Sequence, residues 1–237
     1  MSTEPDLSVV VAAYNASATI GATLRSLLAQ TLESIEIVVV DDGSLDETAR
    51  IVDELRSMDG RVRLVSLDAN GGRSAARNRG LAEASGRWIG ICDADDLWAA
   101  DRAERLVGAA ERHGVDVVTD DQIGFSVGSD GAIVLNHRYA SRATLWMGGE
   151  GCVRRRGWFF DQTCVMRPIV RAAFLRRSGA DYPVHLANGE DLAFYLQLVF
   201  DPSARCILRV GEPLYYYREG ESTRETDGPA DGFDLLT

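Results

Sequence analysis

Short apolar runs alternate with longer amphipathic stretches over the first hundred residues of the chain. The apolar runs are nearly continuous and rich in β-branched residues, which is typical of strands buried on both faces of a parallel sheet. They cover residues 7–11, 35–40, 62–67 and 88–92, and the stretches between them predict helices near residues 17–30, 46–58 and 73–84. This β-α order predicts an α/β fold with a doubly wound, mainly parallel sheet flanked by helices.

The pattern is less regular in the second half of the chain. It predicts a helix over about residues 100–113, a strand at 116–119, helices near 168–177 and 191–200, and a strand around 206–210. Between residues 120 and 160 we expect only short strands. We therefore expect a single domain with halves at residues 1–115 and 116–218, followed by a polar, flexible tail at residues 219–237.

The composition is that of an ordinary globular protein, with 46% hydrophobic and 26% charged residues among 237. The net charge of −11 disfavours a nucleic-acid partner, because phosphate binding needs a basic surface. No apolar stretch approaches the ~20 residues that span a bilayer, and the acidic start differs from a secretory signal. We expect a cytoplasmic protein.

The four cysteines are widely spaced, with no Cys-x-x-Cys pair; they are Cys92, Cys152, Cys164 and Cys206. This spacing argues against a zinc site or a disulfide framework, and it suits a reducing compartment.

Acidic clusters follow two of the predicted strands, at Asp41-Asp42 and at Asp93-Ala94-Asp95-Asp96. Ligands of open parallel sheets bind at the carboxyl ends of the strands, where these clusters meet. Like charges so placed need a positive partner, and a divalent cation is the simplest candidate. Carboxylates two residues apart in extended chain point the same way and suit Mg²⁺ or Mn²⁺. The alternative is that these aspartates only turn the chain and cap the next helix.

Some residues in and after the Asp41-Asp42 cluster have local structural roles. Ser44 and Glu47 have the spacing of a capping box, and Asp42 is a common turn residue. Asp41 has no such structural explanation, so it is the better candidate for a ligand contact.

Residues 70–78 open a helix with glycines, small residues and two arginines, Arg73 and Arg77. They match neither a P-loop nor a dinucleotide fingerprint, although a helix amino terminus with arginine can bind an anion. The alternative to anion binding is that the helix only packs closely on the sheet and its arginines lie on the surface. This alternative has about the same weight as a ligand contact for Arg77 and less weight for Arg73. Further on, Glu190-Asp191 precedes an amphipathic helix, and locally this pair indicates only a helix start.

Taken in order, four segments resemble glycosyltransferase family 2, the inverting enzymes with the GT-A nucleotide-sugar fold. The segments are SVVVAAYN at 8–15, IEIVVVDDGSLDET at 35–48, NGGRSAARNRGLAEASGRWIGICDADDLW at 70–98 and GEDLAFYLQL at 189–198. The resemblance covers residues 7–115 strongly and 160–200 more weakly. It implies a nucleotide-sugar-binding half at 1–115 and an acceptor-binding, catalytic-base half at 116–218.

The resemblance assigns the donor pocket. Tyr14 and Asp41 would line the base and ribose pocket, joined by Ala12, which stands where the family usually has proline. Arg73 would lie beside the nucleotide, and uridine is the base that the family favours. Leu45 stands where the family usually has threonine, a second departure that supplies no catalytic group.

The resemblance also assigns the chemistry. Asp93-Ala94-Asp95 is similar to the family's Asp-x-Asp motif, so Asp93 and Ala94 would bind the nucleotide sugar and Asp95 would bind Mn²⁺ or Mg²⁺ on the diphosphate. Asp191 would be the general base of a single displacement that inverts the anomeric centre. The acceptor would be a saccharide or lipid-linked saccharide in polysaccharide biosynthesis. A processive synthase is disfavoured, since neither a Gln-x-x-Arg-Trp motif nor membrane spans are present.

Two other functions stay open at this stage: a non-catalytic nucleotide-sugar-binding protein, and a nucleotidyltransferase on a similar sheet. The missing phosphate loop and the Glu190-Asp191 pair weigh against the second. Arg154-Arg155-Arg156, followed by Trp158-Phe159-Phe160, allows a peripheral contact with anionic lipid. A basic loop beside a core aromatic cluster is the alternative interpretation of this segment.

Overall fold

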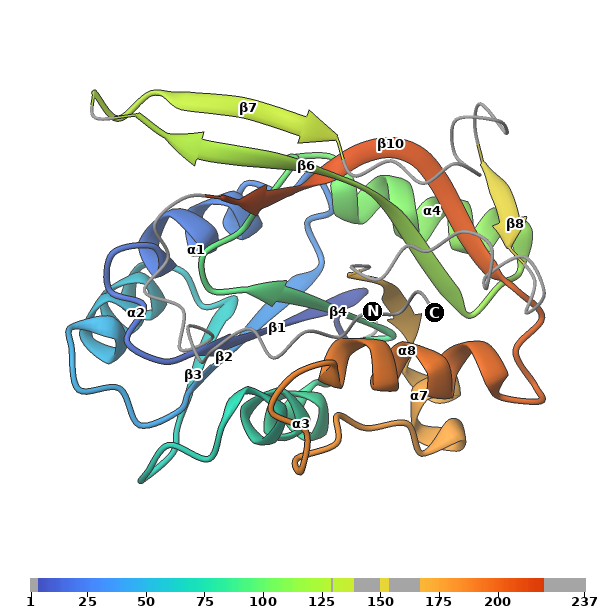
Figure 1. Ribbon diagram of the computed structural model, residues 1–237, viewed down its shortest axis with the longest axis horizontal. Helices are drawn as coiled ribbons and strands as arrows, with labels where there is room; N and C mark the ends of the chain where they lie inside the picture. Colours follow the sequence, from blue (N-terminus) through green and yellow to red (C-terminus); the bar gives the residue numbers. More distant parts are fainter. Residues whose placement is uncertain (1–3, 129, 139–149, 154–166, 220–237) are drawn as a thin grey trace, which may run out of the picture.

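Four parallel strands form the first half of the sheet in the computed structural model (Figure 1). They are β1 (Leu7–Ala13), β2 (Ile35–Asp41), β3 (Val62–Ser66) and β4 (Trp88–Asp93), in the order β3-β2-β1-β4. The model describes residues 4–128, 130–138, 150–153 and 167–219. Each strand begins at the residue predicted from its apolar run.

The second half of the described sheet is mixed. β9 (Ile169–Arg171) is antiparallel to both β4 and β6 (Val117–Val127), and β10 (Ile207–Arg218) runs parallel to β6. Three shorter strands are antiparallel to their neighbours: β5 (Leu97–Trp98), β7 (Ile133–Arg138) and β8 (Gly151–Val153). The α/β class and the mainly parallel sheet with flanking helices are therefore confirmed.

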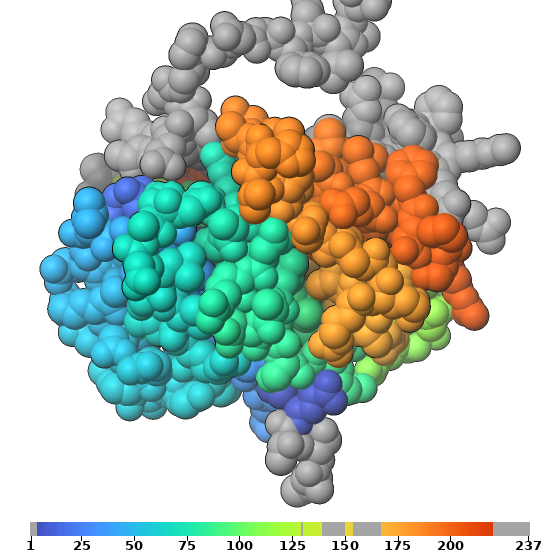
Figure 2. Space-filling model, turned by 90° about the horizontal axis from the view of Figure 1, so that it is seen from below, coloured from blue at the N-terminus to red at the C-terminus, as the bar shows by residue number. Residues whose placement is uncertain are grey.

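Helices cover both faces of the sheet. One face packs against α1 (Ile20–Leu28), α2 (Thr48–Met58) and α4 (Arg102–His113). The other packs against α3 (Arg73–Glu83), α7 (Ala172–Ser178) and α8 (Glu190–Phe200). On that second face the segment after residue 167 lies directly against the α3 region (Figure 2). None of the helices in the described part of the chain is long and apolar enough to cross a bilayer.

Helix α3 lies unusually close to the sheet. A Cβ atom at Gly80 would lie 2.2 Å from the Cγ1 atom of Val10 in β1, so glycine is required for this approach. Ser74, Arg77 and Gly80 are all buried on this side of the helix. The close contact fixes the position of the charged residues that α3 carries.

Three predicted elements need correction. The helix expected at 168–177 begins with a strand, because Ile169 and Val170 pair with β4 and β6 before α7 starts at Ala172. The short strand expected at 116–119 continues to Val127 as β6. The strand expected at 206–210 likewise extends to Arg218, past a register irregularity at Pro213.

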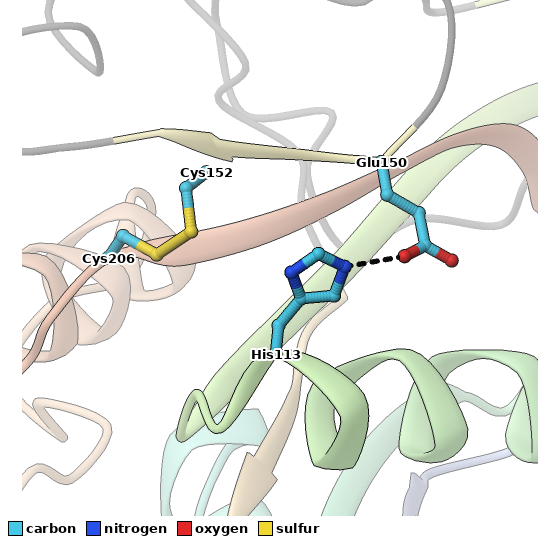
Figure 3. The surroundings of a disulfide bond; sticks show 4 residues. All are labelled: His113, Glu150, Cys152 and Cys206. Carbon is cyan, nitrogen blue, oxygen red and sulfur yellow. Dashed lines mark hydrogen bonds and ion pairs between the residues drawn. A yellow bond between two sulfur atoms is a disulfide. The ribbon is translucent and has the colours of Figure 1, made fainter.

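The cysteine spacing argued against a disulfide framework, but the structure contains a disulfide that this spacing did not anticipate. Cys152 and Cys206 form a disulfide, with their Cα atoms 5.7 Å apart across a sequence separation of 54 residues (Figure 3). The pairing of β8 with β10 places them side by side, since Cys152 lies opposite Leu208. Sequence spacing does not reveal such a contact, because it depends on which strands become neighbours.

Candidate active site

The carboxyl ends of β1, β2 and β4 form one edge of the site. In the strand register, Ala13 lies beside Asp41 and Ala12 lies beside Asp93. The two aspartates therefore flank the end of β1, two strand spacings or about 10 Å apart. Tyr14, the first residue after β1, is partly exposed at the same edge. The fold thus gathers the predicted donor-pocket residues of these strands.

Asp42 does more than form a turn, because its carboxylate binds the backbone of a distant loop. Its two carboxylate oxygens accept hydrogen bonds from the backbone N–H groups of Gly71 (2.9 Å) and Gly72 (2.8 Å). Gly72 has a φ of +87°, which glycine adopts without strain. Asp42 therefore fixes the loop that leads into α3 and Arg73. Asp41, by contrast, accepts one bond, from the Ser44 N–H at 3.3 Å.

The predicted capping box does not form. The Ser44 hydroxyl accepts a hydrogen bond from the Asn15 N–H at 2.9 Å, and Glu47 pairs with Arg50 instead. Helix α2 begins at Thr48 without a side-chain cap. The β2–α2 loop is thus bonded to the β1–α1 loop across the edge of the sheet, an interaction that a local motif could not anticipate.

Asp93 and Asp191 meet at two buried arginines. Arg77 reaches Asp93 with Nη2 (2.7 Å) and Asp191 with Nη1 (2.9 Å). Arg167 reaches Asp93 with Nη2 (2.5 Å) and Asp191 with Nη1 (3.1 Å). The arginine side chains are 5% exposed, whereas the aspartates are 22% and 21% exposed. The site therefore opens to solvent on the carboxylate side.

The two arginines of α3 differ in burial. Arg77, for which a ligand contact and surface packing were equally weighted, is buried in the site, whereas the Arg73 side chain is 44% exposed and lies 3.5 Å from Glu190. Glu190 is buried and lies 3.2 Å from Arg77 as well. The Glu190-Asp191 pair is therefore more than a helix start, because both carboxylates bind arginine.

The loop Asp93–Asp96 turns directly at this site. Asp96 is fully buried, and its carboxylate accepts hydrogen bonds from the Tyr215 hydroxyl (2.6 Å) and the Arg218 N–H (2.8 Å). The Ala94 carbonyl accepts a bond from Thr23. Asp95 is partly exposed at the opening of the loop, and its carbonyl accepts a bond from the Arg218 side chain.

The charges of the site determine which carboxylates are ionised. Burial alone would raise the pKa of Asp93, but Arg167 and Arg77 outweigh it and hold this pKa well below its usual range. Burial, together with the charges of Asp93 and Asp95, raises the pKa of Asp96 well above its usual range. The two ends of the loop thus have opposite electrostatic environments.

The comparison with protein families decides the identity of this fold and site. Residues 8–174, more than half of the chain, match the model described as "Glycosyl transferase family 2". The chain belongs to glycosyltransferase family 2. The matched range contains both acidic clusters, α3 and Arg167, but ends before Asp191.

Curated relatives in this family take part in bacterial polysaccharide synthesis. The succinoglycan biosynthesis protein ExoO of Rhizobium meliloti is 34% identical over 93% of this chain and 63% of its own length. WfaP of Escherichia coli, a UDP-Glc:α-D-GlcNAc-diphosphoundecaprenol β-1,3-glucosyltransferase, is 37% identical over 43% of this chain and 39% of its own length. The chain thus spans less than two thirds of either relative.

Among solved structures, the 1–349 fragment of S. aureus TarS in complex with UDP-GlcNAc aligns with a TM-score of 0.76 at 25% identity. The alignment covers 92% of this chain and 59% of the TarS fragment. The architecture is the GT-A fold that the resemblance implied.

The resemblance assigns metal binding at this edge of the sheet to Asp95. Asp93 and Asp191 already have guanidinium partners, and Asp96 is buried against Tyr215. In the described part of the chain, no three His, Cys, Asp or Glu side chains cluster as a metal site would require. One or two carboxylates plus substrate phosphates are the usual ligands of Mg²⁺ in such enzymes, so the donor set fits a metal that arrives with its nucleotide.

Arg167 is the site residue that sequence reasoning missed entirely. It lies just before β9 in the part of the chain with the least regular pattern. The burial of Arg77 could have been predicted from the sequence, since Ser74, Arg77 and Gly80 are three residues apart on the buried side of α3. A charged residue within such a stripe indicates a buried partner of opposite charge. Arg154 to Phe160, considered for membrane contact, lie outside the described residues.

Proposed function

We propose that this chain is an inverting, non-processive glycosyltransferase that moves a hexose from a UDP-sugar to a hydroxyl of a saccharide or lipid-linked saccharide. The observation that carries the proposal is the meeting of Asp93 and Asp191 at one pair of arginines. It joins the motif expected to bind the donor to the residue expected to deprotonate the acceptor. Membership of family 2, the succinoglycan biosynthesis named for ExoO and the glucosyltransferase activity named for WfaP support the pathway class.

Asp191 is proposed as the general base. Its carboxylate lies in the first turn of α8 and is partly exposed, so an acceptor hydroxyl can approach it. As the acceptor oxygen attacks the anomeric carbon from the face opposite the diphosphate, its proton passes to Asp191. The C–O bond to the diphosphate breaks on the other side, and the configuration inverts.

The donor is proposed to lie along the carboxyl ends of β1, β2 and β4. Tyr14 and Asp41 would contact the base and ribose, with Ala12 forming the floor beside them. Asp93 and Ala94 would contact the nucleotide sugar, and Arg73 at the start of α3 would face the nucleotide. Uridine is proposed as the base from the family resemblance, and it is the nucleotide of the TarS complex.

Asp95 would hold Mn²⁺ or Mg²⁺ together with the donor diphosphate. When bound, the metal supplies positive charge for the leaving diphosphate. Arg77 and Arg167 already pair with carboxylates of the site. We therefore propose that the metal at Asp95, rather than these arginines, neutralises the leaving diphosphate. We further propose action on the cytoplasmic side of a membrane, with a peripheral contact if the acceptor is lipid-linked.

Thermal-shift screening tests the donor class directly. UDP, GDP and ADP, and then UDP-glucose and UDP-GlcNAc, are added to the purified chain with and without Mn²⁺. We expect stabilisation by UDP and one UDP-sugar, increased by Mn²⁺, because a ligand that binds only the folded state raises its stability. The nucleoside triphosphates UTP, GTP and ATP are included in the same screen, and stabilisation by triphosphates alone would instead favour a nucleotidyltransferase.

Donor hydrolysis then tests for catalysis without a known acceptor. Water can replace the acceptor hydroxyl, so release of UDP from the stabilising sugar nucleotide reports turnover. A chain that binds the donor but releases no UDP, with water or with a panel of saccharide acceptors, would be a binding protein rather than an enzyme.

A further inference from the structure

The arginines Arg77 and Arg167 close a ring of four ion pairs with Asp93 and Asp191. Each aspartate uses both of its oxygens, one for each arginine, and each arginine uses both terminal nitrogens. Asp93 ends β4 on the proposed donor side, whereas Asp191 lies in the first turn of α8 on the proposed acceptor side. The ring therefore joins the two sides of the proposed site.

Arg77 is anchored by residues beyond the ring. Its guanidinium lies 5.1 Å from the ring centre of Tyr182, and Glu190 contacts its Nη1 atom. The next residue, Asn78, donates to the Tyr182 carbonyl (2.7 Å) and accepts from the Tyr182 N–H (2.8 Å). Helix α3 is thus bonded to the segment that leads into α8, and these contacts hold Arg77 beside the ring.

Arg167 is anchored through its backbone. Its carbonyl accepts a hydrogen bond from Arg102 Nη2 at 2.6 Å, and Arg102 is itself held by both oxygens of Asp120 (2.9 and 2.7 Å). Its Nη1 atom lies 3.4 Å from the Tyr195 hydroxyl of α8. Arg102, Asp120 and Tyr195 are all buried, so they form a rigid support for the second arginine.

We propose that Arg77 and Arg167 are positioning residues that fix the Asp191 carboxylate relative to Asp93. The inference rests on the function proposed above, in which Asp191 takes the acceptor proton. A partly exposed aspartate in a first helical turn can otherwise turn its carboxylate into solvent. Bridging both oxygens leaves one orientation, and a misplacement of about 1 Å can cost about 100-fold in rate.

Geometry, rather than stability, is what the ring supplies. Buried ion pairs lose hydration, and their mutual attraction often only offsets that loss. The planar guanidinium can contact two carboxylates at once, which a lysine ammonium at the same place cannot do with matched geometry. Arginine is therefore the side chain that this bridging role requires.

Conservative substitution of the arginines tests the proposal. Arg167→Lys and Arg77→Lys keep the charge but lose the bridge. We expect kcat for hydrolysis or transfer of the UDP-sugar to fall about 100-fold. The Kd for UDP, measured by calorimetry with Mn²⁺, should stay within about twofold, which corresponds to a change of less than 0.5 kcal/mol. A raised Kd with unchanged kcat would show that the arginines bind the diphosphate, and would overturn the proposal.

Two further measurements separate positioning from a general structural role. Combined with Asp191→Asn, the Arg167→Lys change should lower kcat no further, because both act on one group; an additional loss would contradict the proposal. Arg171→Lys is the matched control, since Arg171 also pairs with an aspartate, Asp116, but lies outside the ring. We expect it to retain activity within about twofold.

A crystal structure of Arg167→Lys makes the test independent of turnover. We expect the Asp191 carboxylate to rotate away from its present orientation, and an unmoved carboxylate would overturn the proposal. If the unaltered chain binds UDP but never releases it from a sugar nucleotide, the proposed function fails first, and the role of Asp191 as a positioned base fails with it.

Discussion

The Tyr215 hydroxyl donates a hydrogen bond of 2.6 Å to Asp96, a carboxylate that is completely buried. The same hydroxyl accepts a bond from the Asp93 N–H at 3.2 Å. A single phenol from β10 thus supports both ends of the Asp93–Asp96 loop. Because Tyr215 lies in a strand of the second half of the chain, the predicted Asp-x-Asp motif depends on a residue more than a hundred positions away.

Removing this phenol should loosen the loop. Tyr215→Phe leaves Asp96 with one hydrogen bond fewer and the Asp93 N–H without this acceptor. We expect a loss of about 1–3 kcal/mol in the free energy of unfolding, measured by urea titration. Tyr216→Phe is the matched control, since the structure shows Tyr216 partly exposed one residue further along β10. A Tyr215→Phe variant as stable as the parent would contradict this account of the loop.

Asp191 and Asp95 should affect different steps. Asp191→Asn removes the proposed base but keeps its shape, so we expect release of UDP from the sugar nucleotide to fall by about 100-fold or more while UDP binding is kept. Asp95→Ala should instead weaken UDP binding in Mn²⁺ and leave the smaller metal-free binding unchanged. Steady-state kinetics and calorimetry of both variants check this division. Equal loss of binding and turnover in the two variants would contradict it.

The amino-terminal edge of the sheet carries a pH-sensitive contact. Glu36 is buried and accepts hydrogen bonds from Ser8 (2.5 Å) and from the Ser85 N–H (2.6 Å) and hydroxyl (2.8 Å). Burial would raise the pKa of Glu36, but the bonds from Ser8, Ser85 and Arg63 outweigh it and lower this pKa from 4.5. A lowered folded-state pKa stabilises the fold above pH 4.5, and this stabilisation is lost as the pH falls toward the folded value.

Glu36→Gln should therefore lower stability at neutral pH by about 1–3 kcal/mol. The difference from the parent should shrink as the pH falls below 4.5, where the parent also loses its charge. Urea titrations between pH 3 and 7 check the sign. The exposed neighbour Glu33→Gln is the control and should change little at any of these pH values.

The disulfide can be tested by mass and by stability. Peptide mapping under non-reducing conditions should recover Cys152 and Cys206 in one cross-linked fragment. Cys152→Ser and Cys206→Ser should each lower the free energy of unfolding by the same amount, about 2–4 kcal/mol, because either change removes the same cross-link. The double variant should lose no more than either single one. Unequal effects would indicate that the cross-link is not the cause.

Local pattern predicted the elements that lie within one stretch of sequence. The β-branched runs located the starts of β1 to β4 at Leu7, Ile35, Val62 and Trp88, because strands covered on both faces need continuous apolar sequence. The acidic ends of β2 and β4 followed from those strand positions. The fold class followed from the order of the elements, and the family from four motifs in sequence.

The remaining features depend on contacts between distant residues. The role of Arg77 was left open by the sequence because its partners, Asp93 and Asp191, lie 16 and 114 residues away. The sequence indicated a cation for the gathered carboxylates, but it did not indicate that two guanidinium groups would contact Asp93 and Asp191. Ser44 binds Asn15 rather than Glu47 for the same reason: a tertiary partner was available where only a local one could be considered.

Strand β9 limits how this chain could be re-engineered. This three-residue strand pairs with both β4 and β6, so it joins the parallel first half of the sheet to the mixed second half. A chimera cut near residue 115, made to exchange acceptor specificity between relatives, would replace the strand that covers β4 along with Arg167. Exchanges confined to surface loops after β9 would keep the β4–β9–β6 pairing and Arg167 from a single parent.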